Sequence, residues 1–179
     1  MRTLLVALLL ASIAAIWIAA FSLHSTLPEK IPLHFDFSGT PDRWGPSSFG
    51  NWFLIPIIAT AIPALLVGIV PLTNVLLNRC PSIVNVPRKE KLLMLGLDAR
   101  ARALVPLSTM MLSLSILILW MMLYIIIGTS RVALGTWATL PIWPVFVQIP
   151  ALLGLVLWNH WKLARAIDGE FLLIQLDRR

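Results

Sequence analysis

Charged side chains are scarce in this chain. Asp, Glu, Lys and Arg make up 12% of its 179 residues, whereas 59% of the residues are hydrophobic. Soluble domains average about a quarter charged residues and about half apolar ones. The mean hydropathy of +0.88 points the same way. Most of the length is needed by apolar runs of about 20 residues, enough to cross about 30 Å of hydrocarbon, so we expect an integral membrane protein without a large soluble core.

Cysteine and recognisable catalytic motifs are also rare or missing. The single Cys80 excludes an intrachain disulfide and a cysteine-based metal framework. The sequence contains no GxSxG, no Gly-rich phosphate loop and no HExxH. Its few acidic residues are too scattered to nominate an acid–base pair. We therefore expect a protein that is not an enzyme and that uses no cofactor.

The order of apolar and polar segments predicts an all-α integral membrane protein, a four-transmembrane-helix bundle with a structured extracytoplasmic loop between helices 1 and 2. The expected spans cover about residues 3–23, 52–77, 103–128 and 135–160, joined by an outer loop (24–51) and a basic connection (78–102) and followed by a tail (162–179). The first run could instead be a cleaved signal peptide. Its length and the Trp17 within it favour an uncleaved span.

Positive charge is distributed unevenly over the segments that flank these runs. One Lys or Arg precedes the first span, six lie in the basic connection and four in the tail, against two in the outer loop and one before the fourth span. Positive residues favour the cytoplasmic side, so both termini are expected in the cytoplasm and the first loop outside. Because the charges flank spans and form no basic stripe with interleaved aromatics, nucleic acid is not an expected partner.

The last part of the chain carries two further expectations. Gln148 is the most polar side chain within a span, and we expect it to face the bundle interior, because an amide turned to lipid would lack partners. The tail is expected to break its helix near Asp168-Gly169. The apolar stretch at 171–176 that follows is too short to span a membrane.

The first loop is the only polar segment rich in residue types that can recognise a partner. Leu33, Phe35 and Phe37 alternate with His34 and Asp36, so an extended strand would place the apolar groups on one face. A turn is predicted at 38–42. The large apolar residues, Ile31 and Trp44 among them, need a surface to bury them, which predicts a compact lid on the outer end of the bundle rather than a linker.

Five residues of this loop form the expected recognition set: His34, Asp36, Asp42, Arg43 and Trp44. Imidazole and carboxylate groups can hold a divalent metal, which makes the first three candidate ligands as well. The alternative is structural, with Asp36 or Asp42 accepting hydrogen bonds from turn N–H groups and His34 acting as an ordinary hydrogen-bonding side chain.

The loop resembles the membrane family DUF1648, a domain also found in SdpI-type toxin-immunity proteins. The residues that carry the resemblance are Leu27-Pro28, Ile31-Pro32, His34-Phe35, Gly39, Pro41-Asp42 and Trp44-Gly45, with further support from Asn85-Val86-Pro87-Arg88-Lys89-Glu90. The resemblance thus covers about residues 5–105 and defines a first region, 1–105, ahead of the third and fourth spans in 103–161. It implies a membrane protein related to immunity and signal-transducing proteins.

We therefore expect a binding, immunity or signalling protein in the bacterial inner membrane, which recognises an extracytoplasmic peptide or protein through its first loop. The lipid bilayer is its other partner. A small oligomeric transporter is the alternative, but ion and proton paths need ionisable groups inside spans, and none of these spans holds an Asp, Glu, Lys or Arg. A homo-oligomer or an accessory subunit of a larger membrane complex is also open, and co-purification with a partner would reveal it.

Overall fold

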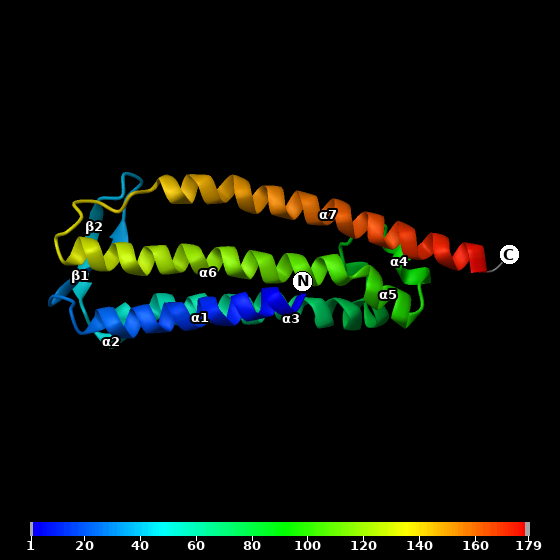
Figure 1. The fold of residues 1–179 in the computed structure, drawn as a ribbon, viewed down its shortest axis with the longest axis horizontal. Helices are drawn as coiled ribbons and strands as arrows, with labels where there is room; N and C mark the ends of the chain where they lie inside the picture. The colour runs from blue at the N-terminus through cyan, green and yellow to red at the C-terminus, as the bar shows by residue number, and fades with distance from the viewer. Residues whose placement is uncertain (1, 178–179) are drawn as a thin grey trace. The chain divides into compact units, whose positions relative to one another are not determined.

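The computed structural model describes residues 2–177, apart from the side chain of Asp177. Helices make up most of it and a single β-hairpin interrupts them (Figure 1). The elements are α1 (Arg2–His24), β1 (Lys30–Phe35), β2 (Pro41–Pro46), α2 (Phe49–Trp52), α3 (Leu54–Arg79), a short 3-10 helix η1 (Pro81–Ile83), α4 (Lys89–Met94), α5 (Leu97–Ala103), α6 (Val105–Ala133) and α7 (Trp143–Asp177).

Three stretches of the described chain are long and apolar enough to cross a membrane. They are Arg2–His24, Leu54–Arg79 and Leu97–Ala133. These stretches coincide with the first three expected spans, because long apolar runs are the strongest signal a membrane sequence carries. The membrane character and the mainly helical fold are thereby supported, and the structured loop expected between the first two helices contains a β-hairpin.

The fourth expected span, 135–160, differs from the helix that is found. Helix α7 begins at Trp143, and the residues before it form the loop that follows Gly135, whose φ is +70°. Pro144 sits in the first turn of α7, where its missing N–H costs nothing. Helix α7 is not among the three stretches that could span a membrane by length and composition. Gln148 and Asn159 lower the hydropathy of this helix.

The described chain divides into two compact units, each assembled from separate stretches of sequence. Unit 1 comprises residues 1–63 and 115–151, and unit 2 comprises residues 64–114 and 152–179. Helices α3, α6 and α7 each contribute one part to each unit. Within unit 1, the hairpin, α2 and the loop before α7 gather at the same end of α1 and α6 (Figure 1).

Unit 2 has the larger apolar core. Its buried members come from the ends of α3 and α6, from α4, α5 and α7, and from the connections between them: Leu77, Val84, Leu92, Leu95, Ala99, Ala103, Leu104, Leu107, Met111, Leu163 and Ile167. Arg100 is 7% exposed in this unit, and its guanidinium donates to Oδ1 of Asn78 and to the carbonyl oxygens of Leu93 and Leu95. The two terminal nitrogens of this buried cation thus find acceptors without a carboxylate, while its Nε has no partner among the described residues.

The expected break at Asp168-Gly169 is wrong, because α7 runs without interruption to Asp177. Both acidic residues of this stretch pair with unit 2 elements. Asp168 lies 2.5 Å from Nζ of Lys91, and Glu170 makes two hydrogen bonds to Arg102. Lys91 holds the pKa of Asp168 below its usual range. These pairs, with Ile167 fully buried beside them, outweigh the cost of about 1 kcal/mol that glycine carries inside a helix.

Candidate functional site

The first loop folds into an antiparallel hairpin. Ile31 pairs with Gly45 and Pro32 with Trp44, and the register shifts twice between Pro32 and Phe35. Prolines occupy both strands, at positions 32, 41 and 46. Proline cannot donate to a β-ladder, so it is tolerated on edge strands and hinders the addition of further strands. The hairpin therefore stays a two-stranded ribbon.

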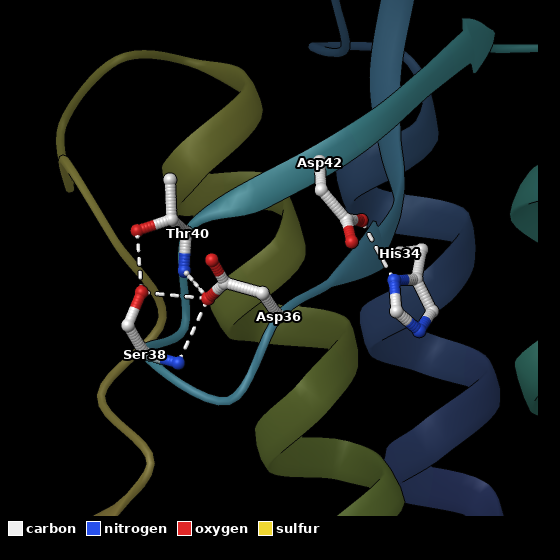
Figure 2. Close-up of polar contacts among 5 residues, drawn as sticks. All are labelled: His34, Asp36, Ser38, Thr40 and Asp42. Atoms are coloured by element: carbon white, nitrogen blue, oxygen red, sulfur yellow. Dashed lines mark hydrogen bonds and ion pairs between the residues drawn. The ribbon is translucent and has the colours of Figure 1, made fainter.

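The turn between the strands is organised by the Asp36 carboxylate. Its Oδ1 accepts hydrogen bonds from the hydroxyl of Ser38 at 2.6 Å, from the backbone N–H of Ser38 at 2.8 Å and from the N–H of Thr40 at 3.0 Å (Figure 2). The Ser38 hydroxyl contributes most to holding the pKa of Asp36 below its usual range. Asp36 is thus a structural residue of the turn, which is the alternative that the sequence analysis left open.

One glycine of the hairpin is required by close approach. Gly39 has a φ of +79°, and a Cβ there would collide with the backbone carbonyl of Leu140. The N–H of Leu140 donates to the Gly39 carbonyl at 2.8 Å, so the hairpin turn is joined to the loop before α7. A Cβ on Gly45 would meet the end of the Leu33 side chain, which can shift. Gly39 therefore demands glycine for both conformational and steric reasons.

The hairpin continues into a well-packed joint between α2 and α3. Ser48 caps α2, and Nε1 of Trp52 donates to the carbonyl of Ala20 on α1 at 2.8 Å. Phe53 is 1% exposed and stacks on Phe49 with ring centroids 4.3 Å apart. Aromatic contacts and a buried indole hydrogen bond therefore fix the segment that follows β2 to the end of α1.

His34 and Asp42 form the most conspicuous polar pair of the hairpin. Nδ1 of His34 lies 2.6 Å from Oδ1 of Asp42, with 59% and 47% of the two side chains exposed. Figure 2 shows the two side chains facing each other across the strands, away from the Asp36 turn. The pair is ordered and open to solvent, which is what a recognition surface needs.

The five expected recognition residues do not form one cluster. His34 and Asp42 are together, and Trp44, at 46% exposed, follows Asp42 by two positions on β2. Arg43 pairs with His34 in the strand register and lines a cavity. Asp36 is held apart in the turn.

The expected burial of the loop holds for one apolar residue and fails for another. Ile31 is 1% exposed, whereas Phe37 is 96% exposed and Trp44 is nearly half exposed. The prediction for Phe37 is wrong because β1 ends at Phe35 and the Asp36 turn breaks the alternation. The described residues also contain no group of three or more His, Cys, Asp or Glu side chains able to hold a metal ion.

A small cavity lies beneath the hairpin, within unit 1. Its volume is about 150 Å³, and it is enclosed by side chains of the hairpin, of the α2–α3 joint and of α6, chiefly Ile31, Leu33, Trp52, Ile55 and Ile126. Arg43 and Thr129 add polar groups to this apolar wall. Thr129 is 4% exposed, and its hydroxyl finds no hydrogen-bond partner among the described residues.

Sequence reasoning missed the cavity because Thr129 and Ile126 are at least 80 positions from the hairpin in sequence. Nothing in the third apolar run marks Thr129 among its other hydroxyl residues. Gln148, in contrast, was expected to need a partner. Its Nε2 donates to the carbonyl of Leu117 on α6 at 2.6 Å, within unit 1.

The chain is similar to a curated protein whose name states no function. A curated protein from Archaeoglobus fulgidus, named only as an uncharacterized protein, is 36% identical over 78 residues, which are 44% of this chain and 42% of that protein. The chain therefore spans less than half the length of this relative. No solved structure matches the chain.

The family model described as Domain of unknown function (DUF1648) matches residues 8–60. These residues hold most of α1, the hairpin, α2 and the beginning of α3, and the stretch at 85–90 lies outside them. The match confirms the resemblance carried by the loop. Residues 8–60 are thus similar to the DUF1648 domain, and the hairpin with its His34–Asp42 pair is the polar part of the matched stretch.

Proposed function

We propose that this protein is a non-enzymatic binding protein that recognises an extracytoplasmic peptide or protein through the hairpin of its DUF1648 domain. The observation that carries the proposal is the His34–Asp42 pair, which is ordered, 2.6 Å apart and open to solvent. Trp44 adds a large exposed aromatic surface on the same strand as Asp42. Exposed aromatic and charged groups held on a rigid element are typical of recognition surfaces.

The rigidity of the hairpin supports a binding role. The Asp36 hydrogen bonds order the hairpin turn itself, the Leu140 N–H holds Gly39 at that turn, and the Trp52 hydrogen bond fixes the segment after β2 to α1. A surface that is ordered before it meets its partner loses less conformational entropy on binding.

The proposed location is the plasma membrane of a bacterium, with four spans, α7 as the fourth, and both termini in the cytoplasm. The charge distribution favours this orientation, since eleven of the fourteen Lys and Arg residues lie before the first span, between the second and third, or in the tail. The hairpin then faces outward. An immunity or signalling role like that of SdpI-type proteins would place the same hairpin in contact with a secreted peptide.

Site-specific photo-crosslinking in cells tests the proposal. A photoreactive amino acid replaces Phe37, which is 96% exposed at the turn of the same hairpin, and a control chain carries it at Leu172 on α7, which is 55% exposed. We expect a discrete adduct from position 37 that disappears with His34→Gln or Asp42→Asn and persists with Lys30→Gln. Adducts that are absent, or that are indifferent to all three substitutions, would overturn the proposal.

A further inference from the structure

We propose that the cavity beneath the hairpin binds an organic carboxylate that carries an aliphatic or aromatic group about the size of benzene. The inference deepens the proposed function and rests on it, because it names the chemistry that one side of the recognition hairpin would take. The cavity is formed by residues of the DUF1648 domain and by Ile126 and Thr129 of α6.

The size and walls of the cavity set the apolar part of the ligand. A cavity of about 150 Å³ lined by aliphatic and aromatic side chains is large enough to take up benzene. The present cavity has about that volume, and Ile31, Trp52 and Ile126 supply such walls. A phenyl or branched aliphatic group fits, whereas a sugar or a nucleotide base with many polar atoms would leave its own donors and acceptors unpaired.

Arg43 sets the charge of the ligand. It is exposed to solvent and lines the cavity, and among the described residues the lining includes no Asp or Glu. The neighbouring Asp42 carboxylate is engaged by His34. No ion pair to Arg43 is found among the described residues. A guanidinium beside an apolar cavity matches a carboxylate, to which it can make two parallel hydrogen bonds.

Thr129 provides the second, independent indication of a ligand. Its hydroxyl is buried and unpartnered in the described structure, yet its side chain lines the cavity. Buried polar groups almost always have partners, so a buried and unpartnered hydroxyl on a residue that lines a cavity marks a place for an oxygen atom from outside the chain. Thr129 would donate a hydrogen bond to an oxygen atom of the ligand whose carboxylate binds Arg43.

Two sources share this chemistry. One is the C-terminal residue of a hydrophobic peptide, and the other is a free small carboxylic acid. Calorimetric titration of the full chain in detergent distinguishes them with two matched probe pairs. The first pair is 3-phenylpropionate and its neutral amide, and the second is a hydrophobic pentapeptide ending in Phe with either a free or an amidated C-terminus.

We expect saturable binding of at least one carboxylate probe and much weaker binding of its amide. A peptide acid that binds more tightly than phenylpropionate identifies a peptide C-terminus, and the reverse order identifies a free acid. Arg43→Gln should weaken binding of the carboxylates by about 10- to 100-fold. Lys30→Gln removes the same charge from an exposed position of the same hairpin outside the cavity lining and should leave binding unchanged.

Thr129→Val separates a ligand-binding role from a structural one. The hydroxyl makes no hydrogen bond to be lost in the described structure. The ligand-free variant should therefore unfold at the same or a higher temperature while binding the carboxylate several-fold more weakly. Binding that is unchanged in both Arg43→Gln and Thr129→Val, or carboxylates that bind no better than amides, would overturn the inference.

The two proposals can fail separately. Crosslinked adducts at position 37 without carboxylate binding would remove the cavity ligand and leave partner recognition by the hairpin. Saturable carboxylate binding without adducts would remove partner recognition by the hairpin and leave the cavity ligand.

Discussion

The backbone N–H of Leu140 donates a 2.8 Å hydrogen bond to the carbonyl oxygen of Gly39. This bond joins the hairpin turn to the loop before α7, about a hundred residues later in sequence. The same pair explains why Gly39 must be glycine, since its φ of +79° and its distance from the Leu140 carbonyl both exclude a Cβ. The hairpin is therefore held by a contact from outside the matched domain.

Gly39→Ala should destabilise the hairpin through this contact. A left-handed conformation costs a residue with a Cβ about 1–2 kcal/mol, and the steric collision with Leu140 adds to that cost. Gly50→Ala is the matched control, because a Cβ on Gly50 meets nothing within 4 Å. Thermal unfolding in detergent should show a lower midpoint for Gly39→Ala alone. Equal midpoints for the two variants would contradict the contact.

The Asp36 turn should weaken only in strongly acidic solution. The Ser38 hydroxyl and the turn N–H groups lower the pKa of Asp36 in the folded protein below 3.8. The ionised carboxylate therefore stabilises the turn fully at pH values above 3.8, and this stabilisation is lost as the pH falls through the lowered pKa. The amide chemical shifts of Ser38 and Thr40 should titrate with a midpoint below 3.8, and Asp36→Asn should abolish the transition. A midpoint at or above 3.8 would argue against these hydrogen bonds.

Arg100 should stabilise unit 2 by donating hydrogen bonds to backbone carbonyl oxygens. Its guanidinium bonds the carbonyls of Leu93 and Leu95 and the side chain of Asn78 while almost fully buried. Arg100→Met would leave these acceptors unsatisfied, at a cost of about 1–3 kcal/mol. Arg79→Gln removes an exposed charge nearby in sequence and should change the unfolding midpoint little. Equal stability of Arg100→Met and Arg79→Gln would show that the carbonyls find other partners.

Much of this fold could be predicted from the sequence, for identifiable reasons. Long apolar runs predicted α1, α3 and α6. The mixture of prolines, glycines and alternating apolar and polar residues predicted an extended, structured loop. The end of the alternation at Phe35 could not be read from the pattern, because the three hydrogen bonds to Asp36 determine it. The continuation of α7 past Gly169 depends on ion pairs to Lys91 and Arg102, residues far away in sequence.

Some residues of the candidate site could be predicted from the sequence, and others could not. His34 and Asp42 were singled out by residue type, and the irregular register of the hairpin, which pairs His34 with Arg43, brings their side chains within 2.6 Å of each other. Arg43 was singled out with them, but its place at a cavity depends on α6. Thr129 was not singled out, since the absence of a hydrogen-bond partner is a property of packing that no local sequence pattern encodes.

Cysteine labelling of intact cells tests the proposed orientation. In a Cys80→Ser background, Phe37→Cys lies at the exposed hairpin turn and Ile83→Cys at the 66%-exposed η1 in the basic connection. An impermeant thiol reagent should label position 37 in intact cells and position 83 only after the membrane is opened, because positive charge favours the cytoplasmic side. The opposite order would reverse the topology and place the hairpin in the cytoplasm.

Hydrogen exchange across the hairpin most directly tests the central claim that this segment is an ordered recognition element. The amides of Gly39, Thr40, Ser47 and Leu140 donate hydrogen bonds in the described structure, to Asp36, Asp36, Glu29 and Gly39 respectively. We predict that in the detergent-solubilised full chain these amides exchange at least ten times more slowly than in an unstructured peptide, a ratio that corresponds to about 1.4 kcal/mol of local opening free energy. Exchange at the unstructured rate at all four positions would contradict the account.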